Sequence, residues 1–163
     1  MGSSPAVSTL LAPFSEWLGS WEGEGRGLWD VEPPFRYRES LSIEPVPDRA
    51  LLRWSQRTAV WESGELSHSE VGFLRLLPDQ EVELVVTVPA GYVEVHTGRL
   101  HEGALALVPR SLGATPTARP LRLVQRTWEL RGETLRTAIG IAVGDGAVAA
   151  HVEARLHRAS AGA

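Results

Sequence analysis

Apolar and polar residues alternate along most of this chain, and short turn-forming segments interrupt the alternation. The segment 81–88, "EVELVVTV", is typical. A period of two residues indicates a β-strand with one buried and one solvated face. Glycine, proline and aspartate gather in the interruptions, as in "PVPDR" and "VGDG", which favour tight turns. The pattern predicts ten strands, at about 21–30, 36–45, 50–61, 66–76, 80–88, 91–99, 103–109, 121–131, 134–143 and 147–157.

The connections between these segments are too short for parallel pairing, which needs long crossovers, so we expect an antiparallel meander. A meander of this many strands usually closes on itself and so removes its edges. A barrel of about ten strands is wide enough to hold a ligand. The predicted fold is therefore all-β, an up-and-down antiparallel barrel of about ten strands. One longer gap, 110–120, is expected to be a loop over the mouth.

The N-terminal region departs from this pattern. Phe14, Trp17, Leu18 and Trp21 recur at helical spacing and predict a short helix that Gly19 ends. The glycines in "WEGEGRG" favour a strongly curved first strand, and Trp21 is expected to plug the closed end of the barrel. We divide the chain into a flexible arm (1–9), the barrel (10–158) and a tail (159–163).

Composition narrows the functional classes. The chain has 163 residues, which suits one domain, and 43% of them are hydrophobic, which is ample for a core. Its net charge is −4 with the two signs mixed, so nucleic acid is not an expected partner. No apolar stretch is long enough to span a membrane, and the N-terminus lacks the features of a signal peptide. There are no cysteines, which excludes thiolate chemistry. We expect a cytoplasmic protein without a membrane partner.

With no cysteine and one methionine in the chain, histidine is the obvious candidate for an axial metal ligand. The sequence lacks the zinc spacings H-x-x-H and H-E-x-x-H, and it has no G-x-S-x-G elbow. His101 falls in a turn and His157 near the end of the last strand, where solvated positions are expected. His96 shares a face with Tyr92 and Glu94, and His68 is a candidate buried hydrogen-bonding group. The residues alone leave the choice among these four and His151 open.

Strict alternation places His151 on the polar face of the last strand, with Glu153 and Arg155, while Val152 and Ala154 form the apolar face. A bulge, a strand start or a rim position at His151 would allow it to face the interior. In "LRLVQRTWELR", the same reasoning assigns Arg122, Arg126 and Arg131 to a solvated face.

Seven ordered segments resemble the nitrobindin family of haem-binding β-barrels, which are related in shape to the fatty-acid-binding proteins. The first is "GSWEGEG" (19–25), which fits G-x-W-x-G-x-G. The others are "PPFRYRE", "SQRTAVW", "HSEVGFLR", "VELVVTVPAGYVEVHTG", "TPTARPL" and "HVEARLHR". The resemblance extends over roughly residues 10–158, and an ordered set of seven segments is highly specific.

The resemblance implies a cofactor and a reaction. Members of the family hold haem b near the barrel mouth, bind nitric oxide and isomerise peroxynitrite to nitrate. The residue that matches their axial ligand is His151, in "HVEARL". A basic residue in the loop "TPTARP" lies close to the haem in the family, and here it is Arg119, with Thr117 as a further contact. The family usually has Lys at position 119 and Leu at position 152.

Two other functions use the same fold. One is a carrier of a fatty acid or another apolar molecule, which would hold the carboxylate with an inward-facing arginine, and the sequence does not decide whether Arg53, Arg57 or Arg126 faces inward. The other is a nitric-oxide sensor or carrier, which would share every site residue with the isomerase. A homodimer is an expectation for the assembly.

Overall fold

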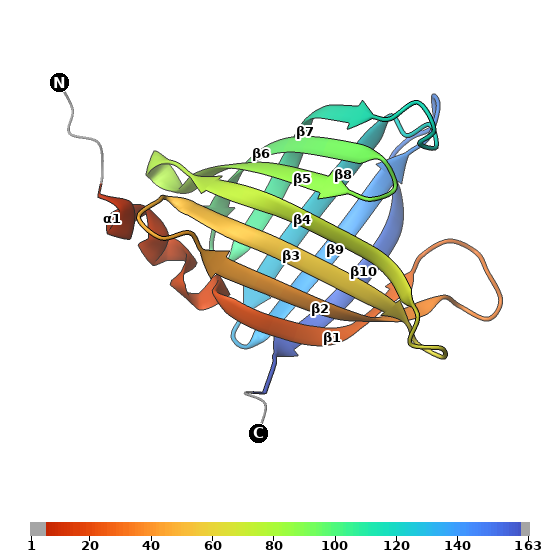
Figure 1. Cartoon of the computed structure of the whole chain (residues 1–163), viewed down its shortest axis with the longest axis horizontal. Coiled ribbons are helices and arrows are strands. Elements are labelled where there is room, and N and C mark those ends of the chain that lie inside the picture. Colours follow the sequence, from red (N-terminus) through yellow and green to blue (C-terminus); the bar gives the residue numbers. More distant parts are fainter. Residues whose placement is uncertain (1–5, 161–163) are drawn as a thin grey trace.

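The computed structural model describes residues 6–160 and consists of one closed β-barrel with a short helical segment at one end (Figure 1). The helical segment comprises α1 (Val7–Leu11) and the 3-10 helix η1 (Ala12–Trp17). A second, three-residue 3-10 turn, η2, spans Pro78–Gln80. The strands are β1 (Gly19–Gly27), β2 (Arg36–Pro45), β3 (Leu51–Val60), β4 (Leu66–Leu76), β5 (Glu81–Val88), β6 (Tyr92–His101), β7 (Ala104–Ala114), β8 (Leu123–Arg131), β9 (Thr134–Ala142) and β10 (Ala149–Arg158).

Each strand pairs with its sequence neighbours, and β1 pairs with β10 to close the barrel. All ten pairs are antiparallel. The nine pairs of sequence neighbours have connections too short for a crossover. The predicted fold class, strand number and N-terminal helix are confirmed. No helix of residues 6–160 is long and apolar enough to cross a membrane.

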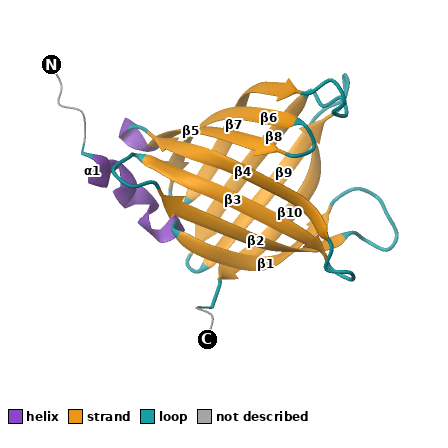
Figure 2. Cartoon of the chain, in the orientation of Figure 1, coloured by secondary structure: helices purple, strands orange, loops and turns teal. Residues whose placement is uncertain are grey.

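The helices lie across one end of the barrel, and the opposite end carries the longer loops (Figure 2). We call these the closed end and the mouth. At the closed end, Phe14, Trp17 and Trp21 are almost completely buried, and the Trp21 indole N–H donates to the Trp17 carbonyl at 2.9 Å. Trp21 therefore plugs the closed end, as the sequence predicts, although it belongs to β1 rather than to the helix.

Most strand boundaries agree with the sequence predictions to within two residues, and three boundaries differ in a way that matters for the fold. α1 begins at Val7, inside the segment 1–9 expected to be an arm, whereas residues 1–5 and 161–163 lie outside the described residues. β1 ends at Gly27 instead of residue 30. β7 continues to Ala114, so residues 110–114 are strand and not loop. The cause is a bulge opposite β6, where His96 pairs with Pro109 but Val95 pairs with Ser111, which lets pairing resume beyond Arg110.

The barrel interior changes from apolar to polar between the closed end and the mouth. Leucines and Trp21 fill the closed end, and Trp54 and Trp128 stack above them with ring centroids 3.9 Å apart. Next comes a set of six buried polar side chains, which we call the polar layer: Glu39, Gln56, Glu70, Glu94, His96 and Arg126. The closed half of the interior is therefore packed with protein side chains.

Candidate functional site

His151 lies at the mouth, at the start of β10. The register of β10 against β9 shifts between Ala150 and Val152, so His151 is the extra residue of a bulge. Its carbonyl accepts a hydrogen bond from the Leu28 backbone N–H at 2.8 Å. The bulge confirms one of the predicted ways to free His151 from the alternation of its strand, and the ring is half-buried at the rim.

An aromatic column holds the His151 ring. Trp29 stacks on the imidazole with centroids 5.0 Å apart, and Phe35 stacks on Trp29 at 5.3 Å. Gly27 makes this packing possible, because a Cβ at that position would lie 2.4 Å from the indole ring of Trp29. Phe35 therefore lines the mouth, and the β1–β2 loop serves to position the histidine.

Burial lowers the pKa of His151, and the charge of the nearby His68 lowers it further. A lowered pKa keeps the imidazole neutral at physiological pH, which is the form that binds a metal. His151 thus combines an accessible rim position, a fixed ring and an available lone pair.

Arg119 and Thr117 lie in the loop between β7 and β8, which is at the mouth with His151. Both are exposed. The Arg119 carbonyl accepts a hydrogen bond from the Tyr92 hydroxyl, which fixes the loop to the inner wall. Arg119 makes no ion pair with another described residue, so its guanidinium is available for an anionic group at the rim.

The other histidines are placed differently. His101 and His157 are exposed at the closed end, as expected. His68 is half-buried near the mouth and lies 3.4 Å from Glu70. His96 is 1% exposed and belongs to the polar layer. No three His, Asp or Glu residues in the range 6–160 are grouped so as to hold a metal ion.

Arg126 corrects a sequence prediction. It was assigned to a solvated face, but it is 2% exposed and faces the interior. Its guanidinium donates to Glu70 at 2.7 and 2.8 Å and to Glu94 at 2.7 and 2.9 Å. The alternation of β8 indicates that one face is solvated but does not tell which face it is. Arg126 can lie on the inner face because two carboxylates pair with its guanidinium. Arg122 and Arg131 are exposed, as predicted.

The carboxylates of the polar layer are held in different protonation states. Burial opposes ionisation of Glu70, but the charge of Arg126 and hydrogen bonds from His68 and Arg126 outweigh it and hold the pKa at about 2. Glu39 has no cation bonded to it. Burial outweighs the lowering effects of Gln56 and of the Arg126 charge and raises its pKa to about 7, and neither carboxylate oxygen has a hydrogen bond of standard geometry with a described residue. Glu70 is therefore ionised at neutral pH, while Glu39 is about half protonated.

Glu39 gives a prediction about stability and pH. Because its pKa is about 7 in the folded protein and 4.5 ordinarily, the folded state binds the proton more tightly. The free energy of unfolding therefore falls as pH rises from about 4.5 to 7, by roughly 3 kcal/mol from this group. Glu39→Gln should remove this slope, as measured by urea unfolding at pH 5 and 7.5. Glu44→Gln, at an exposed position on the same strand, is the control, and equal slopes in both variants would contradict the assignment.

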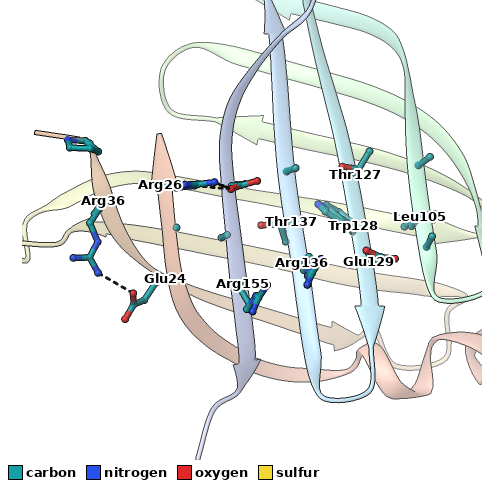
Figure 3. Close-up of a pocket in the computed structure, with 17 residues that line it drawn as sticks. Glu24, Arg26, Arg36, Leu105, Thr127, Trp128, Glu129, Arg136, Thr137 and Arg155 are labelled. Atoms are coloured by element: carbon teal, nitrogen blue, oxygen red, sulfur yellow. Dashed lines mark hydrogen bonds and ion pairs between the residues drawn. The ribbon is translucent and has the colours of Figure 1, made fainter. Parts of the chain in front are cut away.

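A shallow depression of about 910 Å³ lies elsewhere, on the outer wall of the barrel (Figure 3). Charged side chains that face away from the interior surround it, among them Arg26, Arg136 and Arg155. Arg26 is paired with Glu153 at 2.6 Å. His151 does not line this depression, so it is not the site at the mouth.

The fold and the mouth define an antiparallel β-barrel that presents His151 at its opening. The chain belongs to the family of THAP4-like, heme-binding β-barrel domains, whose model matches residues 10–158. This confirms the resemblance to nitrobindins. The curated relatives include peroxynitrite isomerase 1 of Rhodococcus jostii, which is 38% identical over 80% of this chain and 72% of its own length. Peroxynitrite isomerase Rv2717c of Arabidopsis thaliana is 30% identical over 96% and 93%.

A solved structure agrees with these relatives. Rv2717c of M. tuberculosis superposes with a TM-score of 0.83 and 29% sequence identity, covering 93% of this chain and 98% of its own.

The described residues fit a haem at the mouth. A haem brings four nitrogen ligands and needs one or two axial ligands from the protein, which a single neutral imidazole supplies. His151 is such a ligand, the aromatic rings of Trp29 and Phe35 offer apolar contact, and the exposed guanidinium of Arg119 suits a propionate. A haem site needs no metal-binding cluster, so the absence of one among residues 6–160 is compatible with it.

Proposed function

We propose that the protein is a haem-dependent peroxynitrite isomerase with His151 as the axial ligand. One observation carries the proposal: His151, which is neutral at physiological pH, lies on a bulge at the mouth with Trp29 stacked on its ring. The barrel belongs to the haem-binding family. Curated relatives at up to 38% identity bear the name peroxynitrite isomerase. The small-molecule substrate is then peroxynitrite and the product nitrate, with haem b as the cofactor.

The chain's own residues have three tasks in this function. His151 would bind the haem iron through its neutral imidazole. Trp29 stacks on the imidazole and Phe35 stacks on Trp29, so the two rings would hold the imidazole plane in place. Arg119, with Thr117 beside it, anchors the acidic edge of the cofactor by a charge-assisted hydrogen bond. The bound haem supplies the chemistry of O–O cleavage, and isomerisation needs no net proton transfer from the protein.

The packing of the interior disfavours the carrier of a fatty acid. Arg126 is the inward-facing arginine, but Glu70 and Glu94 already occupy its guanidinium. Arg53 and Arg57 are exposed. The stacked Trp54 and Trp128 fill the space below the polar layer, where an acyl chain would lie.

A spectroscopic titration followed by a kinetic assay tests the proposal. We expect hemin to bind in a one-to-one ratio with a sharp Soret band. Stopped-flow mixing of the ferric protein with peroxynitrite should then accelerate its decay and raise the nitrate yield. If haem binding is saturable but peroxynitrite decay is not accelerated, the nitric-oxide carrier becomes the favoured function. A nitric-oxide titration of the ferrous protein then tests that function. The absence of saturable binding would overturn the proposal. Sedimentation at micromolar concentration decides whether a homodimer forms.

The aromatic column gives a further prediction. Trp29→Leu removes the ring that stacks on His151, so we expect haem to dissociate about tenfold faster, a change typical of lost support around a metal ligand. The measurement is the transfer of haem to excess apomyoglobin, followed at the Soret band. Trp61→Leu is the matched control, because Trp61 lies just beyond β3, also at the mouth, and stacks on Arg36 and Arg38 rather than on His151. Equal rates in the two variants would contradict the positioning role.

A further inference from the structure

The barrel wall has a seam between β7 and β8. These strands pair only through Ala104–Leu107 and Arg126–Glu129, although β7 continues to Ala114 and β8 begins at Leu123. The bulge at Arg110 and the neighbouring Pro109 explain why pairing stops there. A bulge increases the local twist, and proline has no N–H to donate. On the mouth side of Leu107 the two strands therefore leave a gap.

A hollow of about 90 Å³ occupies this gap. At about 30 Å³ for each water molecule, it has room for roughly three waters, or for an anion of a few atoms. Two arginines, Arg110 and Arg122, line it from the outside, and Glu94 and His96 line it from the polar layer. The hollow thus connects a buried histidine with two surface cations.

His96 has an unsatisfied nitrogen at this hollow. Its Nε2 lies 2.9 Å from Glu94 Oε2, and hydrogen bonds from His96 and Arg126 outweigh burial to lower the pKa of Glu94. Because the Glu94 carboxylate is ionised, Nε2 must carry the proton that the hydrogen bond requires. Nδ1 has no partner among the described residues, although the side chain is 1% exposed. Buried polar atoms are nearly always hydrogen-bonded, so Nδ1 calls for a partner in the hollow.

The surrounding charges indicate the kind of partner. The groups that face His96 are Glu94 on its own strand, Arg126 of β8 with Glu70 beyond it, and Arg110 and Arg122 across the hollow. Three cations and two carboxylates leave a positive balance. With its proton on Nε2, His96 is an acceptor at Nδ1, so a water molecule that donates one hydrogen bond to Nδ1 and the other to an anion would link the two.

We propose that the seam between β7 and β8 is a binding site for a small monovalent oxyanion, held by Arg110 and Arg122 at its rim and joined to His96 Nδ1 through a water molecule. The site is separate from His151 and does not rest on the proposed function. Nitrate is the suitable probe because it is small, planar and singly charged. If the isomerase function holds, nitrate is also the product, and the seam offers it a place away from the haem.

Nitrogen-15 NMR of the full-length, haem-free protein labelled at histidine tests this proposal. Nitrate replaces chloride at constant ionic strength and constant pH. We expect the Nδ1 resonance of His96 to move saturably as its hydrogen-bond partner changes, while the His157 signals stay in place. Arg110→Gln should weaken nitrate binding at least about fivefold, and Arg110→Lys should restore most of it. Arg53→Gln, at an exposed position near the closed end, is the control.

Two results would overturn the proposal. One is a His96 resonance that nitrate does not shift, and the other is the same weak, unsaturable shift in the wild type and in Arg110→Gln. Neither result depends on haem, so the seam can fail while the haem function stands. Conversely, a protein that binds no haem can still show the nitrate response.

Discussion

Replacing His151 by Ala should lower the affinity for haem by about 100-fold, which corresponds to roughly 2.7 kcal/mol. The reason is that His151 is the histidine whose ring is fixed at the mouth with a lowered pKa. The measurement is a hemin titration at the Soret band, with dissociation rates from apomyoglobin transfer. The band of any haem that remains should be broad and shifted, since the axial imidazole is missing.

The controls for this prediction come from the same chain. His157→Ala removes an exposed histidine from the same strand, at the closed end, and should leave both the affinity and the spectrum unchanged. His151→Gly opens a space at the mouth that added imidazole can fill, so imidazole should restore the wild-type band. If His151→Ala binds haem like the wild type and His68→Ala does not, the ligand is His68 and the assignment is wrong.

Replacing Arg126 by Met should destabilise the fold by about 3–5 kcal/mol at pH 7, because it leaves Glu70 and Glu94 buried without their cation. Both carboxylates are almost completely inaccessible, so water cannot replace the four hydrogen bonds of the guanidinium. Urea unfolding of the haem-free protein measures the effect. Arg53→Met, which breaks an exposed ion pair with Glu44, should change the stability far less.

Two further measurements separate charge from packing at Arg126. Adding Glu70→Gln and Glu94→Gln to Arg126→Met removes the unpaired charges, so the triple variant should recover much of the lost stability. In acid, the stability that the wild-type ion pair contributes should be lost progressively as the pH falls from 4.5, the ordinary pKa of a glutamate, to the pKa of Glu70, about 2. A triple variant as unstable as Arg126→Met would show that the loss is one of packing.

The sequence determined the architecture well, because each strand alternates and each turn is short. It also placed Trp21 at the closed end and found the contradiction at His151 that the bulge resolves. The sequence prediction was wrong for Arg126. Both faces of β8 carry polar residues, and alternation alone does not tell which face points into the barrel. The identity of the buried partners depends on Glu70 and Glu94, which lie 56 and 32 residues away along the chain.

The aromatic column could not be predicted either. Trp29 lies beyond the end of β1, where no periodicity constrains the direction of a side chain, and its contact with His151 spans the closure of the barrel. One signal was available: Gly27 precedes Trp29 by two residues, and a glycine at a strand end often marks a close approach of another group. The seam between β7 and β8 could not be predicted either, because Pro109 indicates the end of a strand in the sequence, whereas β7 continues beyond it.

Both ends of the barrel domain lie at its closed end, where α1 leads into β1 and β10 finishes beside it (Figure 1). Whatever is attached at either end is therefore held at the pole opposite the mouth. A protein immobilised by a tag at either terminus should present its opening to the solution in a uniform orientation. Cofactor exchange on a sensor surface should then proceed as fast as in free solution, and a fused fluorescent reporter would sit too far from the mouth to obstruct it.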